Sequence, residues 1–256
     1  MTTDATAELR RVHALRWQDA DAAANYRFRA TYPPETFDIL LSLLGDAPRN
    51  ILDVGCGTGN LARRLAPLVD RVDAVDVSRE MIAAAHELPD GDRPNIHWQV
   101  ARAEQAVLDP PYGLVVGGES LHSIDPEVAL PRFASVLAPG GMLAVTRPVE
   151  SDKEPWDAAV REVIVRYSTG YAPFNMIAKW ERAGLFQKRG ERETVPVMFE
   201  QSVEDFIAAF HAMSSLTRAH IDADTFDHEV REIMLKHCPS GIVRRPIRGH
   251  VIWGEL

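Results

Sequence analysis

Short apolar runs and helical segments alternate along the chain from residue 50 to residue 147. The runs NILDV, RVDAVDV, NIHWQV, GLVVGGE and MLAVTRP are separated by segments whose sequences are typical of helices. Strands that alternate with helices form a parallel sheet, because each crossover helix returns the chain to the same end of the sheet. The run GLVVGGE is apolar enough for a strand buried on both faces. We therefore predict an α/β fold with a Rossmann-like, mostly parallel sheet and helices on both of its faces.

Beyond residue 148 this alternation loosens. Residues 151–183 are typical of polar helices, and SVEDFIAAFHAM and TFDHEVREIMLKHC predict two further helices. The segments LFQKRGERETVPVMFEQ and IRGHVIWGEL can each hold one strand. We expect these two strands to complete a seven-stranded sheet, and the helices between them to form a helical lid.

A glycine-rich turn, DVGCGTG at residues 53–59, follows the first apolar run and precedes a helix. Glycines at alternate positions let the backbone turn tightly and let a ligand approach it closely. Asp76 ends the second predicted strand, where a carboxylate can accept both hydroxyls of a ribose. The spacing G-x-G-x-G differs from the pyrophosphate-binding G-x-G-x-x-G and suits a nucleoside without a pyrophosphate. Asp53 can either contact the ligand or brace the turn, and both readings stay open.

The net charge, the absence of long apolar runs and the two cysteines argue against nucleic acid, a membrane or a metal ion as a partner. The 256-residue chain has a formal net charge of −9 and no appended basic module, so we expect no nucleic-acid partner. No stretch approaches roughly 18 uninterrupted apolar residues and the N-terminus has no apolar signal segment, so we expect no membrane partner. Cys56 and Cys238 suit neither a disulfide framework nor a zinc site. We expect a reduced cytoplasmic protein, a monomer or homodimer, without a bound metal.

Five segments, in order, are similar to the motifs of class I S-adenosyl-L-methionine-dependent methyltransferases, specifically the small-molecule branch often called type 11. ILDVGCGTGNLARRLA resembles the first motif, VDAVDVSREMIAAA the second, ARAEQAVL the third, LVVGGESLHSID the fourth and LAPGGMLAVTRP the fifth. NYRFRATYP is similar to the Y-x-x-R-P-x-Y-P segment of that branch, although Ala30 replaces its proline. The resemblance covers about residues 25–148 and implies S-adenosyl-L-methionine as cofactor.

The resemblance also implies which residues contact that cofactor. They are Gly55, Gly57 and Gly59 along the methionine and ribose portions, Asp76 at the ribose hydroxyls, Val77 and Met81 at the adenine faces, Ala103 and Glu104 at the adenine edge, Tyr26 and Arg29 at the cofactor carboxylate, and Glu119 at the methionine end next to the substrate. From the pattern along the whole chain we expect three parts: an N-terminal helical cap segment at residues 1–45, a cofactor-binding Rossmann-like core at 46–148, and lid helices plus final strands completing the sheet at 149–256.

Methyl transfer from a sulfonium is an in-line displacement that depends on placing the nucleophile against the methyl group and excluding water. A carboxylate acceptor needs no strong base, whereas an alcohol or an amine has more need of one. His122, just after the fourth predicted strand, is the catalytic candidate, and a packing histidine at a helix start is the alternative. His211, on the predicted lid, is a second candidate.

The tetrapeptide Asp109-Pro110-Pro111-Tyr112 resembles the clamp with which some enzymes methylate the amino group of a base. In those enzymes the clamp follows the fourth strand, whereas here it precedes the fourth predicted strand. We therefore expect the prolines to shape a turn at the end of the sheet away from the ligand.

Together these observations favour methyl transfer to a small organic acceptor in secondary metabolism, with O-methylation of a carboxylate or hydroxyl favoured. The alternatives are a non-methylating reaction on the same fold, such as a cyclisation, methylation of RNA or protein, and a binding module that has lost catalysis. The intact glycine turn and Asp76 count against the last of these.

Overall fold

The computed structural model describes residues 19–46, 48–150, 153–168 and 176–256. The helix predicted before residue 19 lies outside these ranges, as does part of the helical segment predicted at residues 151–183. Up to residue 148, strands and helices follow one another in the predicted order.

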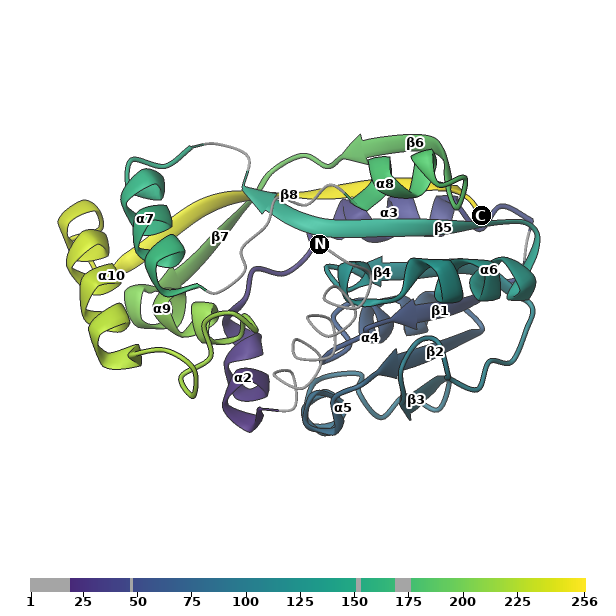
Figure 1. The fold of residues 1–256 in the computed structure, drawn as a ribbon, viewed down its shortest axis with the longest axis horizontal. Helices are drawn as coiled ribbons and strands as arrows, with labels where there is room; N and C mark the ends of the chain where they lie inside the picture. Colours follow the sequence, from purple (N-terminus) through teal and green to yellow (C-terminus); the bar gives the residue numbers. More distant parts are fainter. Residues whose placement is uncertain (1–18, 47, 151–152, 169–175) are drawn as a thin grey trace.

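One mixed sheet runs through the molecule in the strand order β3-β2-β1-β4-β5-β8-β6, with β7 also paired to β8 (Figure 1). The first five strands are parallel: β1 (Asn50–Val54), β2 (Arg71–Asp76), β3 (Ile96–Val100), β4 (Tyr112–Gly118) and β5 (Leu137–Glu150). β8 (Ile242–Glu255) is antiparallel to β5. The predicted Rossmann-like α/β fold class is confirmed.

The last strand position of the sheet is divided between two strands. β6 (Gln187–Glu193) pairs with the second half of β8, and β7 (Val197–Ser202) pairs with its first half. The sequence predicts one strand in this region, because the interruption at Thr194 to Pro196 is only three residues long. Eight strands therefore fill the seven predicted positions.

The helices flank the sheet and form a separate cluster at one end of it. They are α2 (Ala20–Asn25), α3 (Pro34–Ser42), α4 (Ala62–Leu65), α5 (Arg79–His86), α6 (Pro126–Val136), α7 (Asp157–Tyr167), α8 (Met176–Arg182), α9 (Val203–His211) and α10 (Ala223–His237), with the 3-10 turns η1 (Tyr26–Phe28), η2 (Ala66–Leu68) and η3 (Leu121–Ser123). Ser78 and Ser202 accept hydrogen bonds from the backbone N–H of Met81 and Asp205, as N-cap residues do.

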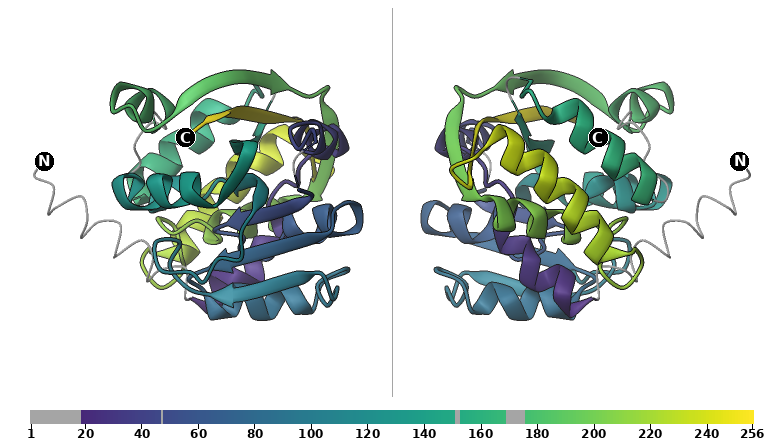
Figure 2. Two further views of the ribbon diagram at one scale, coloured as in Figure 1. Left: turned by 90° about the vertical axis from the view of Figure 1, so that its right-hand side faces the viewer. Right: turned by 90° about the vertical axis from the view of Figure 1, so that its left-hand side faces the viewer.

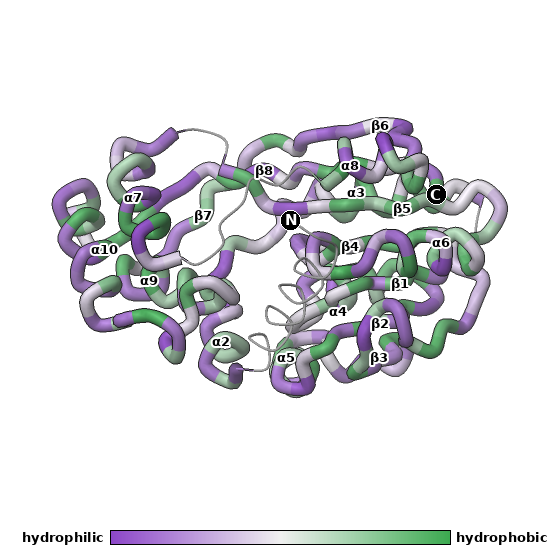
Figure 3. The backbone as a smooth tube through the Cα atoms, in the orientation of Figure 1, coloured by the Kyte–Doolittle hydropathy of each residue, from purple (hydrophilic) through white to green (hydrophobic). Residues whose placement is uncertain are grey.

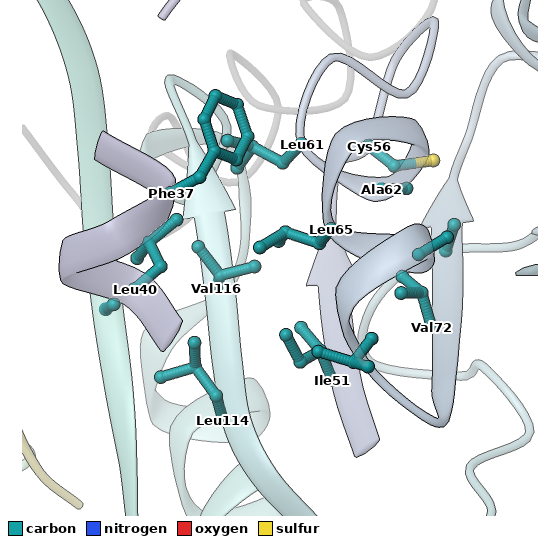
Figure 4. Close-up of a cluster of buried hydrophobic side chains, with 14 of the residues drawn as sticks. Phe37, Leu40, Ile51, Cys56, Leu61, Ala62, Leu65, Val72, Leu114 and Val116 are labelled. Atoms are coloured by element: carbon teal, nitrogen blue, oxygen red, sulfur yellow. The ribbon is translucent and has the colours of Figure 1, made fainter. Parts of the chain in front are cut away.

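Apolar side chains from α3 and α4 cover one face of the central strands. Phe37 and Leu40 of α3 and Leu65 of α4 pack with Leu114 and Val116 of β4 (Figure 4). Burying these groups removes apolar surface from water, at roughly 1.5–3 kcal/mol for each large side chain. This packing fixes α3, and with it the segment that leads into α3 from η1.

The opposite face of the same strands is covered by α6 and α8. Phe133 of α6 and Trp180 of α8 belong to a cluster with Val115 of β4 and Leu143 of β5. Val115 lies between Leu114 and Val116 in sequence and faces the other way, as alternation along a strand requires. β4 is thus buried on both faces, as its sequence predicts.

Helices α7, α9 and α10 form a lobe with β7 and the first half of β8. Phe206, Phe226 and Val243 lie in its core, and α7 and α10 pack side by side (Figure 2). His211 is fully buried there, with Nδ1 2.8 Å from the carbonyl oxygen of Leu216 and Nε2 2.6 Å from Asp227. His211 is therefore a bonded core residue, and it does not face the cavity described below.

The free edge of the sheet at β6 is strongly hydrophilic, in contrast to the central strands (Figure 3). Its sequence is QKRGERE, and Lys188, Arg189 and Glu191 form ion pairs on its surface. Charged side chains on an edge strand disfavour pairing with another chain. No helix among the described residues is long and apolar enough to cross a membrane.

Candidate functional site

A cavity of about 770 Å³, including its mouth, lies at the carboxyl ends of the parallel strands. Ligands bind at this end of open α/β sheets. It is lined by Tyr26, Val54, Gly55, Gly57, Val75, Asp76, Val77, Met81, Ala101, Arg102, Ala103, Glu104, Gly118, Glu119, Ser120, Ser123 and Ile124. The predicted cofactor-binding residues are thus brought together here, except Gly59 and Arg29.

The glycine turn forms one wall of the cavity. Gly55 and Gly57 have positive φ angles of 67° and 54°, which residues with a Cβ rarely adopt. A Cβ on Gly55 would overlap the side chain of Ser120, and one on Gly57 would come 3.7 Å from the Tyr26 ring. Gly59 instead lies against Trp98, where a Cβ would overlap the indole. Its lack of a side chain therefore serves the packing of the turn.

Asp76 ends β2 beside this turn. Its Oδ2 accepts a hydrogen bond from the Gly57 N–H at 2.8 Å, and its Oδ1 accepts one from the Ser78 N–H at 2.8 Å. Burial raises the pKa of the Asp76 carboxyl above its ordinary value, and hydrogen bonds from backbone N–H groups, those of Ser78 and Gly57 foremost, oppose that rise. A carboxylate has about four acceptor positions, so each oxygen keeps one position for a ligand hydroxyl.

Asp53 lies beneath the same turn and is 1% exposed. Its Oδ2 accepts the N–H of Ala62 at 3.1 Å, at the start of α4, while Oδ1 has no partner. Burial, with a smaller contribution from Asp76, raises the pKa of Asp53 to about 7. Asp53 does not line the cavity. Of the two readings open from the sequence, the structure favours a brace for the turn.

A second wall carries the side chains predicted to surround the adenine. Val77, Met81 and Ala103 line the cavity directly. Glu104 also lines it, but its Oε1 accepts the N–H of Asp125 at 2.8 Å, and its Oε2 lies 3.4 Å from Arg102. Glu104 therefore already connects the end of β3 to the start of α6.

A third wall joins η1 to the loop after β4. The Arg29 guanidinium donates to Glu119 at 2.8 Å and lies 5.5 Å from the centroid of the Tyr26 ring. Burial raises the pKa of Tyr26 to about 12, so its hydroxyl stays protonated at neutral pH. Glu119 has a φ of 56°, uncommon for a residue with a side chain, and such strain concentrates at functional sites. Arg29 reaches the cavity wall only through Glu119.

His122 lies in η3 with an exposed side chain and does not line the cavity, whereas its neighbours Ser120, Ser123 and Ile124 do. Sequence analysis missed these three residues. Their position immediately after β4 was the available signal, because residues that follow the carboxyl end of a parallel strand border the ligand.

The Asp109-Pro110-Pro111-Tyr112 segment lies at the opposite end of the sheet, as predicted. Tyr112 opens β4, is fully buried and donates its hydroxyl hydrogen bond to Asp73, and Asp109 pairs with Arg71. These residues have structural partners remote from the cavity. In the described ranges, no group of three or more His, Cys, Asp or Glu side chains is placed to hold a metal ion.

The cavity residues fit S-adenosyl-L-methionine. Asp76 retains acceptor capacity for a ribose diol, and the positive-φ glycines leave backbone open to a ligand. The Arg29–Glu119 pair places one positive and one negative charge at the end predicted for methionine, whose ammonium and carboxylate groups carry the complementary charges.

Residues 51–141 match the family described as "Methyltransferase domain". An uncharacterized methyltransferase of Mycobacterium tuberculosis is 34% identical over 141 residues, and a trans-aconitate 2-methyltransferase of Streptomyces avermitilis is 31% identical over 148 residues. Each alignment covers 55% of this chain and 55% of the relative, so the chain spans about half the length of these curated relatives.

The fold has counterparts among solved structures. A putative type II methyltransferase from Anaeromyxobacter dehalogenans superposes with a TM-score of 0.61 at 23% identity, covering 88% of this chain and 95% of that one. At this identity the similarity concerns the fold alone. Residues 51–141 thus carry a methyltransferase domain, and the chain has the Rossmann-like fold of methyltransferases.

Proposed function

We propose that this protein transfers a methyl group from S-adenosyl-L-methionine to a small organic acceptor, with a carboxylate or hydroxyl oxygen as the favoured acceptor atom. The observation that carries the proposal is the position of Asp76. Its carboxylate ends β2 and borders the same cavity as the positive-φ Gly55 and Gly57. This arrangement suits a ligand with a ribose and no pyrophosphate.

In this proposal residues 46–148 hold the cofactor, residues 1–45 cap it, and residues 149–256 supply lid helices and the final strands of the sheet. Asp76 accepts the ribose hydroxyls, and Val77 and Met81 flank the adenine. Ala103 and Glu104 lie at the adenine edge. Glu119 faces the ammonium group of the methionine portion.

The bound cofactor supplies an electrophilic methyl group on a positively charged sulfur. The protein orients that group towards the acceptor and excludes water, which is sufficient for an in-line displacement by a carboxylate. Because the His122 side chain is exposed and outside the cavity lining, we assign most of the acceleration to positioning. A base at His122 stays a testable prediction.

The preference for an oxygen acceptor has modest support. One relative is named for methylation of trans-aconitate, a compound with several carboxylates, although the alignment covers only 55% of either chain. The acidic balance of this chain, −9, disfavours an anionic polymer as substrate.

The test combines calorimetry and mass spectrometry. S-adenosylhomocysteine should bind the purified protein with one-to-one stoichiometry, and a panel of small carboxylates and phenols should include one that yields both a methylated product and S-adenosylhomocysteine. Failure of wild-type protein to bind S-adenosylhomocysteine would contradict the proposal. Turnover of the acceptor without S-adenosylhomocysteine formation would instead indicate a non-methylating reaction.

A further inference from the structure

Tyr32 is a buried polar residue beside the cavity, and it has no part in the proposed function described so far. It is 6% exposed and lies between η1 and α3, in the same NYRFRATYP segment as Tyr26 and Arg29. Its ring packs edge-on against Phe37, with centroids 6.4 Å apart. Its position is therefore fixed by the same cluster that holds α3 against the sheet.

The hydroxyl of Tyr32 is directed at Gly118, the last residue of β4. A Cβ on Gly118 would overlap the Tyr32 oxygen, so this position accommodates the phenol only because it is glycine. Gly118 itself lines the cavity, and Glu119 follows it. The phenol oxygen thus lies at the point where β4 meets the methionine end of the site.

No side chain or backbone group in the described ranges forms a hydrogen bond with this hydroxyl. Other tyrosines in the described ranges are bonded: the buried Tyr112 donates to Asp73, and the half-buried Tyr167 donates to Glu229 at 2.9 Å. The Tyr32 oxygen is not among the fully buried side-chain atoms without a partner, so it is accessible, and a ligand or a solvent molecule can supply its hydrogen-bond partner.

The surroundings of the phenol determine which chemistry it can offer. Burial, with a further contribution from the Glu119 charge, raises the pKa of Tyr32 well above its ordinary value. The group therefore remains protonated and donates a hydrogen bond, and it cannot act as a base near neutral pH. Glu119 accepts a hydrogen bond from Arg29, so a guanidinium is held on this side of the cavity. A hydrogen-bond donor beside a guanidinium suits an anionic oxygen of the ligand.

We propose that Tyr32 is a cofactor-positioning residue whose hydroxyl donates a hydrogen bond to the carboxylate of the cofactor's methionine portion. This inference rests on the proposed function, since it needs that cofactor in the cavity. It adds a neutral donor beside the Arg29–Glu119 pair, from the other end of the same segment.

The test is Tyr32→Phe, which removes only the hydroxyl and keeps the ring on Phe37. Binding is measured by calorimetry with two ligands: S-adenosylhomocysteine, which carries the carboxylate, and 5′-methylthioadenosine, which has the same adenosine thioether without the amino-acid portion. We expect the affinity for S-adenosylhomocysteine to fall about tenfold or more, the range for a hydrogen bond to a charged group, with unchanged affinity for 5′-methylthioadenosine.

Thermal unfolding separates a ligand contact from a structural effect. Because the Tyr32 hydroxyl has no partner in the protein, Tyr32→Phe should not lower the stability of the ligand-free protein. Tyr167→Phe, which removes a bonded hydroxyl in the lobe, is the matched control and should leave both affinities unchanged. Equal binding of S-adenosylhomocysteine by wild type and Tyr32→Phe would overturn the inference, as would an equal loss for both ligands. If wild type binds neither ligand, the proposed function itself fails.

Discussion

Replacing Asp76 by alanine should weaken cofactor binding by about a hundredfold or more. In the structure, one position on each carboxylate oxygen is occupied by a backbone N–H, from Gly57 and from Ser78, both at 2.8 Å. One position per oxygen remains, which matches the two hydroxyls of a ribose. Hydrogen bonds to a charged acceptor contribute roughly 1.5–3 kcal/mol each, so losing two costs at least about 3 kcal/mol, or roughly 150-fold in Kd.

Calorimetry with S-adenosylhomocysteine measures this loss, but Asp76→Ala also removes the partner of Gly57 and so could move the turn. A 2′-deoxy analogue of the ligand separates these effects. Wild type should bind the analogue more weakly than the parent compound, whereas Asp76→Ala should bind the two almost equally, because the missing hydroxyl has no carboxylate to meet. Asp70→Ala, an exposed aspartate outside the cavity, is the control.

Two results would refute the reasoning. One is an Asp76→Ala variant whose affinity for S-adenosylhomocysteine lies within about threefold of wild type, since even one lost charged hydrogen bond exceeds that. The other is a wild-type protein that does not distinguish the 2′-deoxy analogue. The pH dependence provides a further check: because burial raises the Asp76 pKa, affinity should fall on acidification at a higher pH than for an ordinary aspartate.

Three further predictions concern residues around the cavity and in the lobe. The pKa of Asp53 is raised from 3.8 to about 7, so between pH 3.8 and about pH 7 the folded protein holds a proton that the unfolded chain has released. This proton stabilises the folded state fully below pH 3.8, and the stabilisation is lost as the pH rises through about 7. Asp53→Asn should therefore show a flatter pH dependence of the unfolding free energy in urea over that window, and parallel curves would contradict the assignment. His122→Ala should lower kcat by less than about tenfold at unchanged cofactor affinity, because the side chain is exposed; a loss of a hundredfold or more, typical of a general base, would show that positioning alone is insufficient. His211→Leu should lower the unfolding free energy by roughly 2–4 kcal/mol, measured by urea unfolding, because it leaves Asp227 and the Leu216 carbonyl without a buried partner. A change of less than about 0.5 kcal/mol would show that these bonds contribute little.

Strand ends, together with the resemblance to methyltransferase motifs, predicted most of the residues that line the cavity. Each parallel strand ends at the same edge of the sheet, so the residues after β1, β2, β3 and β4 had to meet there. Asp76 could be identified for this reason without any knowledge of its partners. The same rule pointed to the residues after β4, although it did not separate the inward Ser123 and Ile124 from the exposed His122.

Residue identity alone did not predict contacts between distant segments. The pattern G-x-G-x-G treats its three glycines alike, yet Gly59 is required by the indole of Trp98, far along the chain. Arg29 was expected at the cofactor carboxylate, and the structure shows it bonded to Glu119, ninety residues away. The interruption that divides β6 from β7 also depends on a non-local feature, the length of β8, which pairs with both.

These contacts between distant segments limit what the similar proteins indicate about the acceptor of this chain. The family match covers residues 51–141 and includes the glycine turn, Asp76 and Glu119. Tyr26, Arg29 and the segment entering α3 lie outside it, held in place by packing of α2 and η1 against α5 and α9. The cavity wall is thus built partly from a segment, represented by Tyr26, that the matched domain does not contain. Sharing the matched domain therefore argues for a shared cofactor, while the acceptor must be found by measuring this chain itself.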